Sequence, residues 1–150
     1  MKEVTYEGLT FEPYIANKDI KARIEELGRE ITRDCAGKMP LFLCVLNGAF
    51  PFASDLFRAA ESIDAEISFI RLKSYEGTSS TGVVKEVLGL DQSIEGRTVI
   101  IVEDIVDTGN TIDRLINTLK AKNPAEIKIA TLLFKPEALE KNVSPDYVGF

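Results

Sequence analysis

The stretch VIIVEDIVDTGNT, residues 99–111, runs from branched apolar residues into three carboxylates and then into a short turn of small residues. Its first four residues predict a buried strand. After the turn, apolar residues recur at helical spacing. They form one apolar stripe, made of Ile112, Leu115, Ile116 and Leu119. A strand, an acidic turn and a helix in this order favour a parallel sheet that binds its ligand where the strands end.

The rest of the chain alternates helical and extended patterns. Helices are expected over residues 17–34, with Asn17 or Asp19 as the cap, and over residues 51–62. Further strands are expected over residues 41–46, 65–75, 83–90 and 126–135, and residues 145–150 look like the opening of another strand. The sequence therefore predicts one α/β domain, with a mainly parallel central sheet flanked by helices.

Composition narrows the class of function. The 150 residues carry a net charge of -6 and include no histidine, so acid-base chemistry must come from a carboxylate, Lys or Tyr. Cys35 and Cys44 lack zinc-site spacing and are expected to be ordinary reduced thiols. The acidic balance makes a nucleic-acid partner unlikely, and a small molecule is expected instead. Since no secretion signal or membrane span is evident, a cytoplasmic location is expected.

The acidic turn suits a ribose 5-phosphate. Backbone amides at the start of the helix, with the hydroxyls of Thr108 and Thr111, would cradle a phosphate that Gly109 lets approach closely. Neighbouring carboxylates would accept hydrogen bonds from sugar hydroxyls or hold Mg²⁺. The alternative is a helix cap at Asp107 beside a solvated loop. Three clustered carboxylates repel one another, which favours a ligand or metal that relieves the repulsion.

Residues 99–111 closely resemble the phosphoribosyl diphosphate (PRPP) binding motif of the type I phosphoribosyltransferases. The segments LFLCVLNGAF, SYEGTSSTG, LLFKPEAL and PDYVGF follow the arrangement of the hypoxanthine-guanine phosphoribosyltransferases, and the resemblance extends from about Phe11 to Phe150. It implies the fold of that family and a role in purine salvage. The implied reaction is Mg²⁺-dependent transfer of the 5-phosphoribosyl group from PRPP to hypoxanthine or guanine, which gives IMP or GMP and pyrophosphate.

The resemblance also implies roles for the acidic turn. Glu103 and Asp104 would hold the ribose hydroxyls, directly or through Mg²⁺, and Asp107 would be the general base near N7 of the purine. The 5-phosphate would lie in the turn from Thr108 to Thr111. The substrate-binding motif implied by the resemblance comprises Glu103, Asp104, Ile105, Val106, Asp107, Thr108, Gly109, Asn110 and Thr111.

Pyrophosphate would bind the main chain of Leu46, Asn47 and Gly48, where most members of the family place a lysine at the position of Asn47. An unusual peptide bond is expected on one side of Asn47; the alternative is a plain Asn-Gly turn. Lys135 would donate to the 6-oxo group of the base and exclude adenine. Ser74 and Tyr75 would open a loop over residues 76–82 that closes on the reacting centre.

Two further expectations follow from the resemblance, and two alternatives to it stay open. The family continues beyond the segment that ends at Phe150, so residues after this point are expected to have been removed, with part of the base pocket. A homodimer or homotetramer is expected. The open alternatives are transfer to xanthine, adenine, orotate or uracil, and a PRPP-sensing regulator that binds nucleic acid.

Overall fold

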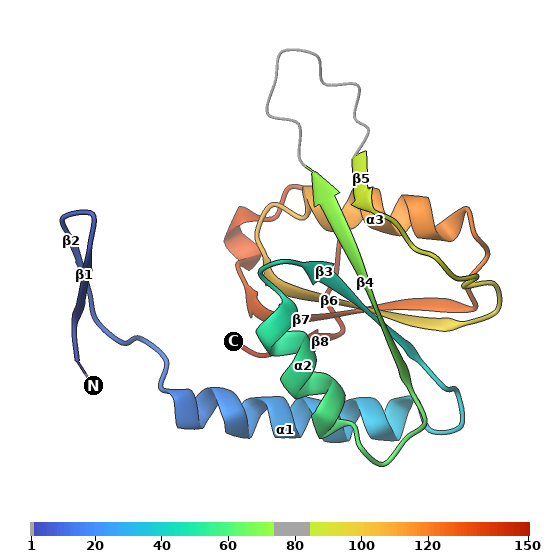
Figure 1. Ribbon diagram of the computed structural model, residues 1–150, viewed down its shortest axis with the longest axis horizontal. Coiled ribbons are helices and arrows are strands. Elements are labelled where there is room, and N and C mark those ends of the chain that lie inside the picture. Colours follow the sequence, from blue (N-terminus) through green and yellow to red (C-terminus); the bar gives the residue numbers. More distant parts are fainter. Residues whose placement is uncertain (1, 74–84) are drawn as a thin grey trace.

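A six-stranded sheet forms the centre of the computed structural model, which describes residues 2–73 and 85–150 (Figure 1). The strand order is β5-β4-β3-β6-β7-β8, and every neighbouring pair is parallel except β4 and β5. The mainly parallel sheet is therefore confirmed. The strands are β3 (Leu41–Leu46), β4 (Glu66–Lys73), β5 (Lys85–Leu88), β6 (Thr98–Val106), β7 (Glu126–Phe134) and β8 (Tyr147–Val148).

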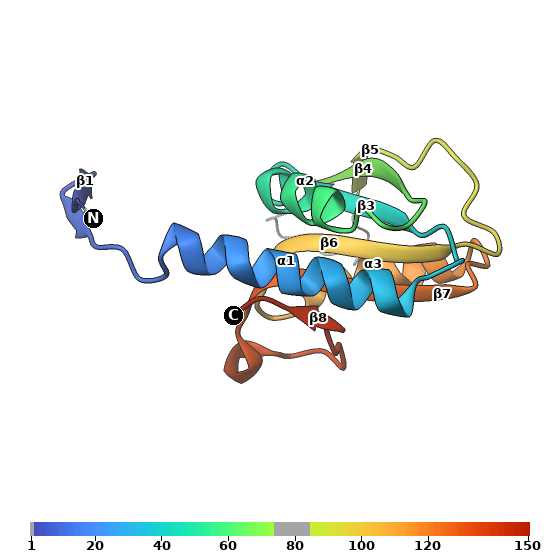
Figure 2. The same cartoon turned by 90° about the horizontal axis from the view of Figure 1, so that it is seen from below.

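Helices cover both faces of this sheet (Figure 2). The first face carries α1 (Asn17–Asp34) and α2 (Phe50–Ala59), the second carries α3 (Asn110–Lys120), and a short 3₁₀ helix η1 (Pro136–Ala138) follows β7. The predicted cap of α1 is wrong. Ala16 is the N-cap residue, and its carbonyl accepts hydrogen bonds from the amides of Asp19 and Ile20, so the backbone alone closes the first turn.

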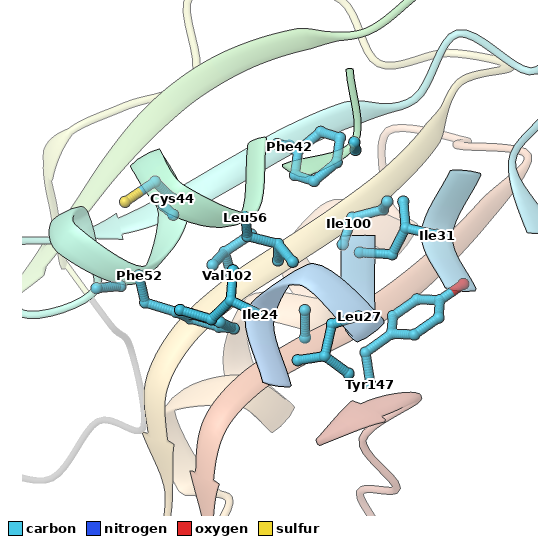
Figure 3. Packing of buried hydrophobic residues seen from close by; sticks show 14 of the residues in the cluster. Ile24, Leu27, Ile31, Phe42, Cys44, Phe52, Leu56, Ile100, Val102 and Tyr147 are labelled. Atoms are coloured by element: carbon cyan, nitrogen blue, oxygen red, sulfur yellow. The ribbon is translucent and has the colours of Figure 1, made fainter. Parts of the chain in front are cut away.

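The sheet separates two clusters of buried side chains. On one face, α1 and α2 contribute Leu27, Ile31 and Leu56, which pack against Phe42 and Ile100 of the sheet (Figure 3). On the other face, Ile112, Leu115 and Leu119 of α3 pack against the alternate residues of β3 and β6. Strands buried on both faces explain the nearly unbroken apolar runs in the sequence.

Strand β6 is longer than its four apolar residues predict. It continues to Val106 because β7 pairs with it to the end, with Glu103 opposite Thr131 and Val106 opposite Phe134. On its other side, β3 pairs with β6 only as far as Val102. Glu103 and Asp104 are therefore strand residues beyond the last pairing with β3, and their expected place after the strand is corrected.

An N-terminal hairpin of β1 (Val4–Tyr6) and β2 (Leu9–Phe11) was not predicted. It stands away from the sheet at the far end of α1 (Figure 1). Its signal in the sequence is the alternation of apolar residues on both sides of Glu7 and Gly8. In the described part of the chain, no helix has the length and apolarity that a membrane crossing requires.

Candidate active site

Three parallel strands end at one edge of the sheet. Strand β3 ends at Leu46, β6 at Val106 and β7 at Phe134, and the three strands are neighbours. Parallel neighbours place their carboxyl ends together, so the segments that follow these strands meet at this edge. The described candidate residues all lie at this edge, which here means the end of the sheet where the parallel strands finish.

The segment after β3 lies against the acidic residues of β6. The peptide bond between Leu46 and Asn47 is cis, which confirms the expected unusual peptide and excludes the plain turn. A Cβ atom added to Gly48 would overlap the carboxylate of Asp104, and the other oxygen of that carboxylate, Oδ1, accepts a hydrogen bond of 2.8 Å from the amide of Ile105. Asp104 thus occupies the space that a side chain at position 48 would need.

Glu103 is a buried carboxyl group, with 9% of its surface exposed. Burial, and to a smaller extent the negative charge of Asp104, raise its pKa to about 8. The thiol of Cys44 lies in the same environment. Burial, and to a smaller extent the negative charges of Glu103 and Asp104, raise the pKa of this thiol to about 11. Negative charge is therefore unfavourable at this point of the sheet unless a cation or a hydrogen-bond donor arrives.

The turn between β6 and α3 is held in one shape by Gly109. This residue is the N-cap of α3 and has φ of +84°, a conformation that favours glycine, and an added Cβ would lie 3.0 Å from Leu139 Cδ1. Thr108 Oγ1 accepts a hydrogen bond of 3.3 Å from the amide of Asn110. Asp107 and Thr111 are exposed at this turn, so the first turn of α3 is open to a ligand.

The segment after β7 forms hydrogen bonds with the end of β6 and with the turn between β6 and α3. The amide of Lys135 donates to the carbonyl of Val106 at 3.0 Å, and the amide of Glu140 donates to the carbonyl of Thr108 at 2.9 Å. Asn110 Nδ2 also donates to Glu140 Oε2 at 3.4 Å. Glu140 was not predicted from the sequence, because the residues next to it in the sequence form no motif that indicates a contact with a turn thirty residues earlier.

The remaining candidates are placed as follows. Ile105 is exposed, whereas the side chain of Val106 is buried in the cluster around α3, so only its backbone reaches the edge. Lys135 is exposed, as are Asn47 and Gly48, and Leu46 is half-buried. The expectations for Ser74, Tyr75 and the loop over residues 76–82 lie outside the described residues.

The carboxylates of Glu103 and Asp104 are the candidate metal ligands at this end of the sheet. Across residues 2–73 and 85–150, no group of three or more His, Cys, Asp or Glu side chains is arranged to hold a metal ion. Two carboxylates, such as those of Glu103 and Asp104, would be enough for Mg²⁺, because this ion commonly uses one or two carboxylates and completes its octahedron with water and substrate oxygens. The donor set therefore suits a metal that arrives with a phosphate-bearing ligand.

The chain is similar to known proteins in sequence and in fold. Residues 12–150 match the model of the phosphoribosyl transferase domain. A hypoxanthine-guanine phosphoribosyltransferase of Streptococcus thermophilus is 42% identical over 136 residues, which are 90% of this chain and 75% of the relative. The bifunctional protein TilS/HprT of Listeria monocytogenes is 39% identical over 137 residues, but the chain spans only 21% of that protein.

A solved structure shows the same fold. The hypoxanthine-guanine phosphoribosyltransferase of Bacillus anthracis, a crystal structure with a HEPES molecule in its active site, superposes with a TM-score of 0.86 at 36% identity. The alignment covers 93% of this chain and 80% of that one. At 36% identity the similarity extends to the sequence as well as to the fold.

Proposed function

The chain belongs to the phosphoribosyl transferase family, and from this premise we propose that it transfers the 5-phosphoribosyl group of PRPP to hypoxanthine or guanine. The products would be IMP or GMP and pyrophosphate, in cytoplasmic purine salvage. The approach of Gly48 to Asp104 carries the proposal. This approach brings the segment after β3 next to the acidic end of β6. The resemblance implies a pyrophosphate site in the first of these segments and a ribose site in the second.

Substrate binding is assigned to the three segments at the sheet edge. The 5-phosphate would accept hydrogen bonds at the start of α3, from the turn of Thr108 to Thr111. Pyrophosphate would lie on the main chain of residues 46–48, whose exposed Asn47 and Gly48 leave the backbone accessible. The ribose would then lie between these two anion sites, beside Glu103 and Asp104.

Asp107 is proposed as the general base. Attack of purine N9 on C1 of the sugar displaces pyrophosphate, and a proton must leave the imidazole ring of the base. Asp107 is exposed at the edge, in the turn that would hold the sugar phosphate, and the chain has no histidine for this task. The carboxylates also suit the positive charge that develops on an oxocarbenium-like sugar.

Glu103 and Asp104 are proposed to hold Mg²⁺ together with the ribose hydroxyls. When bound, the metal would neutralise charge on the departing pyrophosphate. The buried carboxyl of Glu103 would become ionised as a cation or sugar hydroxyl compensates for its burial. These two residues therefore favour a substrate that brings both hydroxyls and a metal.

Base selection is proposed to lie with Lys135. Its backbone is fixed to Val106 at the carboxyl end of β6, and its side chain is exposed. An ammonium group donates hydrogen bonds only, so it suits the 6-oxo group of hypoxanthine or guanine and not the amino group of adenine.

A panel of bases tests this function. The chain is incubated with PRPP and Mg²⁺ and with each of hypoxanthine, guanine, xanthine, adenine, orotate and uracil, and pyrophosphate release is measured. We expect release with hypoxanthine or guanine only, and a strong loss in Lys135→Met. A preference for adenine, orotate or uracil would refute the assignment of Lys135. Absence of turnover with every base, combined with salt-sensitive binding of RNA or DNA, would favour the regulator.

A homodimer or homotetramer is part of the proposal. Phe50 is 52% exposed at the start of α2, and its ring lies 6.5 Å from that of Phe69 on β4. An exposed phenylalanine that lies beside a partly buried one, close to the segment after β3, suits an interface between copies. Light scattering should show an oligomer for the parent chain and a lower mass for Phe50→Ser.

A further inference from the structure

Helix α1 reaches the last strand of the sheet through Arg23. Its Nη2 donates to the carbonyl of Val148 at 2.8 Å, and its Nε donates to the carbonyl of Gly149 at 3.2 Å. On the helix itself, Nη1 pairs with Glu26 at 2.7 Å and with Glu30 at 3.6 Å. The guanidinium is therefore fixed by two carboxylates and presents two donors to consecutive carbonyls.

The residues that Arg23 holds are paired with the end of β7. The amide of Phe150 donates to the carbonyl of Leu132 at 2.8 Å, and the amide of Phe134 donates to the carbonyl of Phe150 at 2.9 Å. The two backbones approach so closely that a Cβ on Gly149 would lie 2.5 Å from Leu132 O. Lys135 follows Phe134 directly, so this ladder ends one residue before the proposed base-recognition residue.

We propose that Arg23 is a positioning residue for base recognition, which acts by fixing residues 148–150 against the strand end that carries Lys135. This inference rests on the proposed function. The backbone at Phe134 and Lys135 is held from two sides, by Phe150 on one side and by Val106 of β6 on the other. Arg23 secures the outer side: β8 is the last strand on its side of the sheet in the described part of the chain, and the guanidinium binds the carbonyls of residues 148 and 149 there.

A second hydrogen bond between α1 and β8 provides a matched control. The hydroxyl of Tyr147 donates to Asp34 Oδ2 at 2.8 Å, near the other end of α1, and Tyr147 pairs with Ala130, well before the end of β7. Removing this hydroxyl weakens the attachment of β8 to α1 without touching the ladder beside Lys135. These two contacts thus separate local positioning from general stabilisation.

The experiment compares four variants of the full chain: Arg23→Met, Arg23→Lys, Tyr147→Phe and Arg29→Met. Arg29 is an exposed arginine of the same helix and controls for loss of charge. We expect Arg23→Met to raise KM for hypoxanthine about tenfold, less than the ~100-fold that a 1 Å misplacement can cost, with KM for PRPP unchanged. Arg23→Lys should recover part of the loss, because an ammonium still reaches a carbonyl. Tyr147→Phe and Arg29→Met should leave both KM values unchanged.

Hydrogen-deuterium exchange supplies a readout that needs no turnover. In Arg23→Met, the peptide that contains Phe134 and Lys135 should exchange faster, and in Tyr147→Phe it should not. Equal rises in KM for base and PRPP, or unaltered exchange at Phe134, would overturn the role of Arg23. If the parent chain turns over no base, the proposed function is refuted, and so is a role of Arg23 in base recognition. Faster exchange in Arg23→Met would then still show that Arg23 stabilises the backbone at the end of β7.

Discussion

Asp107 is an exposed carboxylate in the turn between β6 and α3, and its proposed role is proton removal from the base. Asp107→Asn keeps the size of the side chain and one acceptor oxygen, but it replaces the other oxygen with an NH₂ donor and removes the basicity. We therefore expect PRPP binding to be retained and transfer to slow by about 10²–10⁴-fold, the range typical of general base catalysis. Calorimetry with PRPP and single-turnover kinetics measure the two quantities.

Asp113→Asn, in the first turn of α3, is the control for loss of charge near the turn between β6 and α3, and it should leave transfer almost unchanged. If Asp107→Asn turned over at the rate of the parent chain, another group would have to accept the proton.

Glu103 makes the stability of the ligand-free protein depend on pH. Its pKa is 4.5 when exposed and about 8 in the folded chain, so between these values the folded state binds one more proton than the unfolded state. The free energy of unfolding should therefore decrease as the pH rises through this window, by up to about 1.4 kcal/mol per pH unit. Urea denaturation at several pH values measures the decrease.

Glu103→Gln cannot ionise, and its stability should decrease less over the same window. Glu25→Gln, at an exposed position of α1, should follow the parent chain. Parallel curves for the parent and Glu103→Gln would mean that Glu103 is ionised in the folded state without a ligand.

At the scale of elements, the segment after β3 and the end of β6 depend on each other through Gly48 and Asp104. In Gly48→Ala, the added methyl group would displace the Asp104 carboxylate. We expect about a tenfold or greater loss of affinity for PRPP with Mg²⁺, in line with losses seen when supporting residues of metal sites are changed. Titration calorimetry checks the affinity.

Gly96→Ala is the control for this substitution, because a Cβ there meets no atom within 4 Å. Gly96 has φ of +70°, so the control also reports how much a strained alanine costs in stability alone. Undiminished PRPP affinity in Gly48→Ala would show that Asp104 can move without consequence.

The elements themselves were largely predictable, because apolar periodicity reports burial. The runs over residues 41–46 and 99–102 and the stripe on α3 are direct consequences of a sheet covered on both faces. The last four residues of β6 were not predictable from that run, since they are strand only because β7 pairs with them. The N-terminal hairpin was missed although its apolar residues alternate.

The candidate site was predictable where a local motif carries it. The strand, turn and helix of residues 98–120 appear in the expected order, although Glu103 and Asp104 lie within the strand, and the unusual peptide beside Asn47 is confirmed. The contacts of Glu140 with the turn between β6 and α3, and of Arg23 with residues 148–149, join segments far apart in the chain. Such contacts depend on tertiary packing, which periodicity does not encode.

At the scale of the whole molecule, one sheet supplies side chains to two clusters that share no residue. Ile31→Val affects the first cluster and Ile112→Val the second, and each should lower the free energy of unfolding by about 0.5–1.5 kcal/mol. Their effects should add to within ~0.5 kcal/mol in the double variant. Ile31→Val combined with Ile100→Val, both in the first cluster, should deviate more, because Ile31 and Ile100 lie together (Figure 3).

Urea denaturation of the single and double variants completes both thermodynamic cycles. A coupling energy between Ile31 and Ile112 as large as that between Ile31 and Ile100 would mean that strain passes through the sheet. Without such coupling, sequence change in one cluster leaves the energetic effect of change in the other unaltered. The two faces of the protein can then accumulate substitutions independently of each other, although they share every central strand.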